Sequence, residues 1–201
     1  MTDWVDGIAR ALHPLDAPPG PPGWNHDYLV ELIGNAPRRS AAVLLGVRDA
    51  AEPMVVFTLR RDHLTHHAGQ VSFPGGGAEP GDADVIATAL RESFEEIALE
   101  PAAVEPLGYL DCLETISGFC VTPVVARLPR DVVLQAQPGE VAEVFEVSLE
   151  FLLDPKNVRH VDYRVRGERR KVYEYVGVVP RIWGATAAML VNLIERMGQK
   201  V

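Results

Sequence analysis

The chain of 201 residues contains 47% hydrophobic and 23% charged residues, proportions that are typical of a folded globular domain rather than a disordered chain. Its formal net charge of −9 gives no electrostatic support to nucleic-acid binding, which needs a basic surface. Because no stretch approaches the roughly 18 apolar residues of a membrane span, and because the N-terminus lacks the pattern of a signal peptide, we expect a cytoplasmic protein without nucleic-acid or membrane partners.

The N-terminal segment is expected to form an extension to the main domain. Apolar residues recur at helical spacing over residues 4–12, which predicts a short helix. Residues 13–23 (HPLDAPPGPPG) are too rich in Pro and Gly for a helix and predict an extended connector, with one or two further helical turns at residues 27–33. We therefore divide the chain into an N-terminal helix with its connector, residues 1–36, and a domain of residues 37–201.

The central part of the chain alternates between strand-like and helix-like segments. Two short apolar runs at residues 40–47 and 54–60, separated by a polar turn, predict a pair of strands. A loop rich in Gly and Pro follows at residues 68–82 and leads into a strongly helical segment at residues 85–99. We expect this helix to bury one apolar stripe and to be ended by Pro101. The stripe consists of Ile86, Leu90, Phe94 and Ile97.

The C-terminal part continues this alternation. Strands are expected at residues 107–115 and 118–128, followed by a loop, a strand and a short helix within residues 134–153. Residues 160–178 predict a hairpin around an Arg-Gly-Glu turn, and residues 183–197 predict an amphipathic helix. Because strands and helices interleave, the sequence predicts an α/β fold, a sandwich with a mixed sheet.

Three glutamates lie close together on the predicted helix at residues 85–99. Glu92 and Glu96 are spaced i, i+4, Glu95 lies between them, and all three are predicted on the side away from the apolar stripe. Like charges at this spacing cost roughly 0.2–0.5 kcal/mol per pair, and the C-terminal half of a helix disfavours anions. The face is therefore either fully solvated or neutralised by a divalent cation, and carboxylate oxygens suit Mg²⁺ or Mn²⁺.

The glycine-rich loop and the acidic helix form one motif. The segment Phe73-Pro74-Gly75-Gly76 is followed by Asp82 and then by Arg91-Glu92-Ser93-Phe94-Glu95-Glu96. This combination resembles the Nudix box, G-x5-E-x7-R-E-U-x-E-E-x-G-U, of the Nudix hydrolase family. It departs from that pattern at four points: Asp82 replaces the first Glu, one extra residue precedes Arg91, Ser93 stands at an aliphatic position, and Ala98 replaces the last Gly.

This resemblance implies a fold, a cofactor and the roles of several residues. It implies an α/β/α sandwich with a mixed β-sheet, in which the glycine loop and the helix form a site for Mg²⁺ or Mn²⁺. The implied metal ligands are Glu92, Glu95, Glu96 and the backbone carbonyl of Gly76. Arg91 would orient the glutamates through charge-assisted hydrogen bonds. Asp82 would either pair with Arg91 or cap the helix.

The segment before the glycine loop carries a second motif. It consists of Thr58, Arg60, Gly69 and residues 73–76, with related segments at residues 140–145 and 182–187. These residues are similar to the signature of the coenzyme A pyrophosphatase branch of the family, although Arg61 replaces Ser or Ala and Thr65 replaces a second Arg. The implied substrate is coenzyme A or a derivative, cut at its diphosphate to 3′,5′-ADP and 4′-phosphopantetheine.

The second motif also indicates which residues would meet the substrate. The candidates for phosphate binding are Arg60, Arg61, Gly75 and Gly76. The general base stays open between Glu95 in the helix and Glu140 or Glu143 in the later loop.

Two other interpretations stay open. Thr65 keeps ADP-ribose or another nucleoside diphosphate derivative as an alternative substrate. A non-catalytic, nucleotide-sensing Nudix-like domain is the other alternative, but such domains would typically have lost glutamates that are all present in this motif. The sequence is also compatible with a homodimer, because the N-terminal extension could cover either its own chain or a partner.

Overall fold

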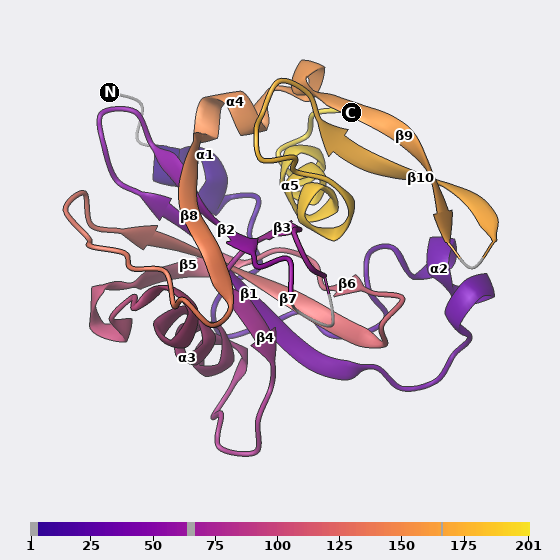
Figure 1. Ribbon diagram of the computed structural model, residues 1–201, viewed down its shortest axis with the longest axis horizontal. Helices are drawn as coiled ribbons and strands as arrows, with labels where there is room; N and C mark the ends of the chain where they lie inside the picture. Colours follow the sequence, from indigo (N-terminus) through magenta and orange to yellow (C-terminus); the bar gives the residue numbers. More distant parts are fainter. Residues whose placement is uncertain (1–3, 64–66, 166) are drawn as a thin grey trace.

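A mixed β-sheet forms the centre of the protein, of which the computed structural model describes residues 4–63, 67–165 and 167–201 (Figure 1). Its strands are β1 (Arg39–Arg48), β2 (Met54–Arg60), β3 (Val71–Ser72), β4 (Gly75–Gly77), β5 (Glu105–Tyr109), β6 (Leu113–Glu114), β7 (Phe119–Leu128) and β8 (Val141–Ser148). The main path runs β3-β2-β1-β7-β5, while β4 pairs with β1, β6 with β7, and β8 with β2. Strands β1 and β7 are parallel, and the other pairings in this sheet are antiparallel. The predicted mixed sheet is therefore confirmed.

Helices cover both faces of the sheet. They are α1 (Trp4–Ala9), α2 (His26–Ile33), α3 (Val85–Ile97), α4 (Leu149–Leu153) and α5 (Gly184–Arg196), with short 3-10 helices at Pro101–Ala103 and Pro155–Asn157. Ala42 and Leu44 of β1 belong to the buried cluster that includes α3, whereas Leu45 and Val47 belong to the cluster that includes α1, α4 and α5. Because both faces are buried, β1 is apolar along most of its length. The predicted α/β/α sandwich is confirmed.

The N-terminal residues pack against the same body. Ile8 and Leu12 join the larger core cluster, and His13 forms an isolated antiparallel bridge with Tyr109. The amide of Asn25 exchanges hydrogen bonds with the backbone of Glu114, at 2.8 and 2.9 Å. The connector is therefore held along the sheet at both of its ends. Within the described residues, no helix combines the length and the apolar character needed to cross a membrane.

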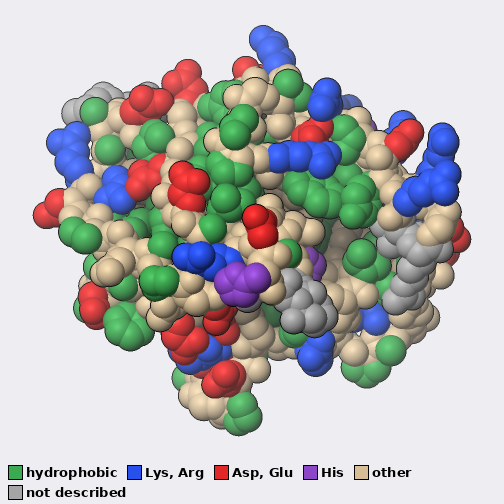
Figure 2. Space-filling model, viewed as in Figure 1, with side chains coloured by type: hydrophobic (Ala, Val, Ile, Leu, Met, Phe, Trp, Pro, Cys, Tyr) green, Lys and Arg blue, Asp and Glu red, His purple; other side chains and the backbone are tan. Residues whose placement is uncertain are grey.

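The C-terminal region consists of the predicted hairpin and helix. The strands β9 (Val158–Val165) and β10 (Glu168–Tyr175) pair antiparallel, and β10 packs against α5. At the start of α5 the hydroxyl of Thr186 donates a 2.8 Å hydrogen bond to the carbonyl of Val71 in β3. The surface is hollowed between the start of α5, β3 and α2 (Figure 2).

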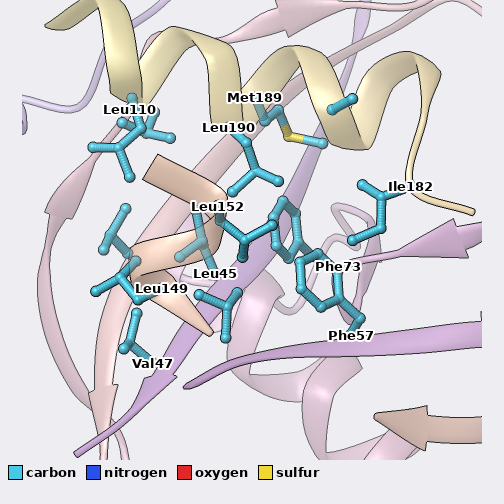
Figure 3. Close-up of a cluster of buried hydrophobic side chains, with 14 of the residues drawn as sticks. Leu45, Val47, Phe57, Phe73, Leu110, Leu149, Leu152, Ile182, Met189 and Leu190 are labelled. Atoms are coloured by element: carbon cyan, nitrogen blue, oxygen red, sulfur yellow. The ribbon is translucent and has the colours of Figure 1, made fainter. Parts of the chain in front are cut away.

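The larger core cluster anchors the loop that leads to α3. Phe73, the first residue of the Phe-Pro-Gly-Gly segment, is fully buried, and its ring lies 5.0 Å from that of Phe57 in β2. Leu152, Ile182 and the side chains of α5 surround this pair (Figure 3). Burying an aromatic side chain of this size contributes about 1.5–3 kcal/mol. The loop is therefore fixed to the core at its first residue.

The face that α3 buries differs from the predicted stripe. Phe94, expected inside, is 48% exposed, whereas Glu96, expected on the outer side, is only 3% exposed. The buried residues of α3 are Thr88, Ala89, Ser93, Glu96 and Ile97. The small side chains of Ala89 and Ser93 let α3 lie close to β1 and β4, and the stripe is consequently rotated by about one residue.

The end of α3 also differs from the prediction. The helix ends at Ile97 rather than next to Pro101, because Ala98 adopts a left-handed conformation with φ of +51°. Its backbone N–H donates to the carbonyl of Phe94 at 3.0 Å, which closes the last turn. This is the position at which the Nudix motif has Gly, and a left-handed residue with a Cβ costs about 1–2 kcal/mol.

We expect Ala98→Gly to stabilise the protein. Glycine relieves the left-handed conformation but makes the unfolded chain more flexible, so the net gain in the free energy of unfolding should be about 0.5–1 kcal/mol. In a chain of this size that raises the melting temperature by roughly 1–4 °C. Ala87→Gly, within the same helix, is the matched control and should lower it. A lower melting temperature for Ala98→Gly would show that Ala98 is not strained.

Candidate functional site

The glycine loop meets α3 through β4. Gly75, Gly76 and Gly77 pair with Val43, Ala42 and Ala41 of β1. Gly75 has φ of +153°, and a Cβ at this position would lie 2.4 Å from the carbonyl oxygen of Ala42. A Cβ on Gly76 would lie 2.5 Å from the carboxyl carbon of Glu92. A side chain at Gly75 would force the backbone of β1 to move, and one at Gly76 would displace the carboxylate of Glu92, so the loop backbone lies directly against α3.

Glu96 is the most buried carboxylate of the site. Its Oε2 accepts a hydrogen bond from the backbone N–H of Gly75 at 3.2 Å, and its Oε1 accepts one from Nη1 of Arg60 at 3.1 Å. The pKa of Glu96 is raised to about 7, mainly by burial and to a smaller extent by the nearby Glu92 and Glu140, while Arg60 and the Gly75 amide lower it. Glu96 is therefore only partly ionised at neutral pH, because one arginine and one amide do not fully offset the cost of burying its charge.

Arg91 connects the other carboxylates of α3 to the loop. Its Nη1 donates to Glu92 Oε1 at 3.0 Å and to Glu95 Oε1 at 3.5 Å, and its Nη2 donates to the carbonyl of Gly77 at 2.9 Å. Burial raises the pKa of Glu92, while Arg91 opposes that effect. Glu95 is exposed at the edge of the site. Arg91 therefore holds Glu92 and the end of the glycine loop in one arrangement.

Asp82 pairs with Arg91, which is one of the two outcomes expected for it. Nε and Nη2 of Arg91 donate to the two carboxylate oxygens of Asp82 at 3.0 and 3.1 Å. The same arginine holds the pKa of Asp82 well below its usual range. The helix cap is supplied instead by Asp84, whose side chain accepts from the N–H of Ala87 at 2.8 Å.

The upstream arginines lie beside these carboxylates. Arg60 ends β2, and its Nη2 lies 3.9 Å from Oε2 of Glu140. The backbone N–H of Arg61 donates to the carbonyl of Glu140 at 3.0 Å. Within the described part of the chain, the Nε atoms of both arginines are buried without a hydrogen-bond partner. These two donors are unmet in this conformation, and an anionic ligand can reach them only if the arginine side chains shift. Thr65 lies outside the described residues.

The predicted site residues are largely brought together. Those that meet around the loop and α3 are Arg60, Gly75, Gly76, Arg91, Glu92, Glu96 and Glu140. Glu143 is exposed on β8, with its backbone paired to Leu59. The ion pair between Arg60 and Glu96 could not be predicted from any local pattern, because 36 residues separate them.

The donor chemistry of this site fits a divalent cation. In residues 4–63, 67–165 and 167–201, no three acidic, imidazole or thiol side chains already converge as a metal site. The carboxylates of Glu92 and Glu96 instead bond to Arg91, Arg60 and Gly75. Their oxygens are hard ligands, and burial raises the pKa of both groups, so the nearby positive charge falls short of what their ionised forms need. A cation that exchanged with the arginine contacts would remove that shortage.

The raised pKa of Glu96 predicts a pH dependence of stability. Because this pKa rises from 4.5 to about 7 on folding, the folded state binds the proton more tightly than the unfolded chain. Protonated Glu96 therefore contributes up to about 3 kcal/mol to the free energy of unfolding. This contribution is complete below pH 4.5 and is lost as the pH rises to about 7.

Denaturant unfolding with a chelator, at pH 5 and pH 8, measures this effect. We expect wild-type protein to lose more stability between the two pH values than Glu96→Gln, in which the titrating group is absent. An identical pH dependence in both proteins would mean that Glu96 titrates normally.

Comparison with known proteins shows which family the chain is similar to. Residues 37–167 match the family model described as the NUDIX domain. The chain is 41% identical over 159 residues to "Uncharacterized Nudix hydrolase NudL" of Photorhabdus laumondii, covering 79% of this chain and 85% of that protein. It is 40% identical over 162 residues to the protein of the same name from Escherichia coli, covering 81% and 84%.

A solved structure supports the fold. The crystal structure of a MutT/nudix family protein from Enterococcus faecalis superposes with a TM-score of 0.52 and 12% identity. The match covers 98% of this chain and 75% of that chain. At this level of identity the similarity concerns the fold alone.

Proposed function

Because the chain belongs to the Nudix hydrolase family, we propose that it hydrolyses the diphosphate bond of coenzyme A or a derivative, releasing 3′,5′-ADP and 4′-phosphopantetheine. The observation that carries this proposal is the position of the upstream motif. Arg60 contacts Glu96 of α3, and Arg61 is held to the backbone of Glu140. Arginines with unmet donors beside a carboxylate cluster suit a diphosphate that is bound between them and a cation, once their side chains shift toward it.

Thr58 helps to position the glycine loop from within the core. It is fully buried in β2, and its hydroxyl lies 3.0 Å from that of Ser72 in β3. This contact fixes the strand that leads into Phe73 and the glycine loop. The motif residue Thr58 therefore acts on the position of the loop rather than on the substrate.

The proposed cation is Mg²⁺ or Mn²⁺, held by Glu92, Glu95, Glu96 and the carbonyl of Gly76. When bound, such a cation neutralises the diphosphate and makes water a stronger nucleophile. Arg91 keeps Glu92 in position through its hydrogen bonds to Glu92, Asp82 and the loop. An acidic chain of net charge −9 needs this local positive charge to hold an anionic substrate.

Arg60 and Arg61, with the backbone of Gly75 and Gly76, bind the phosphates in this proposal. Glu95 and Glu140 are the proposed candidates for the general base, with Glu143 further along β8. The position of Glu140 supports its candidacy, because its carboxylate lies in the site, 3.9 Å from the guanidinium group of Arg60. Loss of the base lowers kcat with little change in KM. Because Glu95 is also a proposed cation ligand, kcat of Glu95→Gln and Glu140→Gln is compared at saturating Mg²⁺, where weaker cation binding no longer lowers the rate.

We also propose that residues 37–201 form the hydrolase domain and that residues 1–36 form an N-terminal extension to it. The family match begins at residue 37, which supports the boundary. Thermal unfolding of a chain that starts at residue 37 tests it, since loss of cooperative unfolding would make the extension part of the domain.

A substrate panel tests the proposed function. The purified protein is incubated with coenzyme A, ADP-ribose, NADH, diadenosine polyphosphates and nucleoside triphosphates, with Mg²⁺ or Mn²⁺, and products are identified by mass. We expect 4′-phosphopantetheine, fastest from coenzyme A and lost on chelation. Preferred cleavage of ADP-ribose would keep the metal site but overturn the substrate. No cleavage of any compound would indicate a nucleotide-sensing domain.

A further inference from the structure

Two aromatic rings and a guanidinium group cluster on the C-terminal hairpin. The ring centroids of Tyr163 in β9 and Trp183 lie 4.8 Å apart at 54°. The guanidinium carbon of Arg181 lies 4.8 Å from the centroid of the Trp183 ring. Tyr163 is 43% exposed, and the side chain of Arg181 is 51% exposed. We call these three residues the Trp183 platform. Exposed aromatic surface next to a cation is typical of ligand contact.

A buried carboxylate holds the platform in place. Glu174 is 6% exposed, accepts a 2.7 Å hydrogen bond from Nε of Arg159, and also accepts one from Nε of Arg181. Its backbone forms an isolated bridge with Trp183. Among the described residues, the hydrogen bonding of Arg181 is confined to Nε. The two Nη groups of an already oriented arginine are therefore available to a ligand.

The platform lies next to the glycine loop. Trp183 stands three residues before Thr186, whose hydroxyl is bonded to Val71 at the start of β3. The preceding residue, Ile182, lies beside Phe73 in the core (Figure 3). On the surface, hydrophobic and basic side chains over the hairpin and the start of α5 border the hollow (Figure 2). A substrate cut at the loop can therefore extend to the platform.

We propose that the Trp183 platform binds the purine nucleotide end of the substrate. Tyr163 and Trp183 supply aromatic surface for the base, and Arg181 meets the phosphate monoester on the ribose. The other end of the substrate is a flexible amide chain without a flat ring. Once the diphosphate is cut, this product carries a single phosphate monoester, whereas 3′,5′-ADP carries two. This assignment rests on the proposed function, because coenzyme A carries both an adenine and a 3′-phosphate.

Calorimetric binding of the separate products to the full chain tests the platform. The ligands are 3′,5′-ADP, 5′-AMP and 4′-phosphopantetheine, each with Mg²⁺ present. We expect Tyr163→Leu to weaken 3′,5′-ADP and 5′-AMP about tenfold, as the loss of one stacking contact does. Arg181→Gln should weaken 3′,5′-ADP about tenfold and 5′-AMP less, because only the former carries the 3′-phosphate. Neither variant should change the affinity for 4′-phosphopantetheine.

Arg169→Gln is the matched control, because Arg169 is exposed on the same hairpin. It should leave all three affinities unchanged. Glu174 keeps its bond to Arg159 when Arg181 is replaced, and thermal unfolding checks that each variant is folded. The proposal is overturned if wild-type protein does not bind 3′,5′-ADP, or if folded Tyr163→Leu and Arg181→Gln both bind it as wild type does.

Coenzyme A turnover separates this proposal from the proposed function. Cleavage of coenzyme A by wild type, with unchanged 3′,5′-ADP affinity in both variants, overturns the platform alone. Binding of 3′,5′-ADP that depends on Tyr163 and Arg181, without any coenzyme A cleavage, overturns the proposed substrate and supports the platform.

Discussion

Glu96→Gln should lower turnover by about 10²–10³-fold while leaving the fold intact. A cation in this site supplies several kcal/mol of charge stabilisation, and each 1.36 kcal/mol corresponds to about a tenfold change in rate. Glutamine keeps the size of Glu96 and an acceptor for the N–H of Gly75, but it removes the charge that the cation requires. The measurement is initial rate against Mg²⁺ concentration, with thermal unfolding to check the fold.

Glu100→Gln is the matched control for this substitution. Glu100 is exposed beyond the end of α3, just before the 3-10 helix Pro101–Ala103, and should retain full turnover when replaced. If Glu96→Gln also retained near-normal turnover, Glu96 would be a structural carboxylate that pairs with Arg60, and the proposed metal site would be wrong.

Gly76→Ala should lower turnover by about 10²-fold. The added Cβ would lie 2.5 Å from the carboxyl carbon of Glu92, so either the loop or the carboxylate must move. A displacement of this kind, on the order of 1 Å, is sufficient for such a loss of rate. The measurement gives kcat, which should fall, and the Mg²⁺ concentration for half-maximal rate, which should rise.

The neighbouring Gly77→Ala provides a close comparison. Its Cβ would meet only a ring carbon of Phe119, at an ordinary contact distance of 3.6 Å. We expect it to be nearly as active as wild type. Equal losses in the two variants would indicate that any side chain on β4 impairs the loop, and that the contact between Gly76 and Glu92 has no special role.

The local parts of the fold could be predicted from the sequence. The strand pair β1 and β2, the hairpin β9 and β10, and the helix α5 each follow from a pattern within one segment. The segment at residues 107–115 could not be predicted in the same way. It is divided into β5 and β6, because Asp111 between them is bonded to distant residues on α5 and in the N-terminal connector.

The candidate site also combines features that the sequence predicts with features that depend on distant residues. The resemblance to the Nudix box implied that the glycine loop meets the glutamates of α3, and the contact between Gly75 and Glu96 agrees with it. The burial of Glu96 was not predictable, because it depends on Gly75 and Arg60, which lie 21 and 36 residues away. The contact between Tyr163 and Trp183 likewise joins two segments whose patterns indicate only a strand and a helix start.

In the proposed mechanism, the glycine loop and α3 form a site for a divalent cation. Titration of the full chain with Mn²⁺, following the free ion by electron paramagnetic resonance, tests it without any assumption about the substrate. We expect wild-type protein to bind Mn²⁺, and the double variant Glu92→Gln/Glu96→Gln to bind it at least about tenfold more weakly. Equal Mn²⁺ affinity in the two proteins would contradict the account.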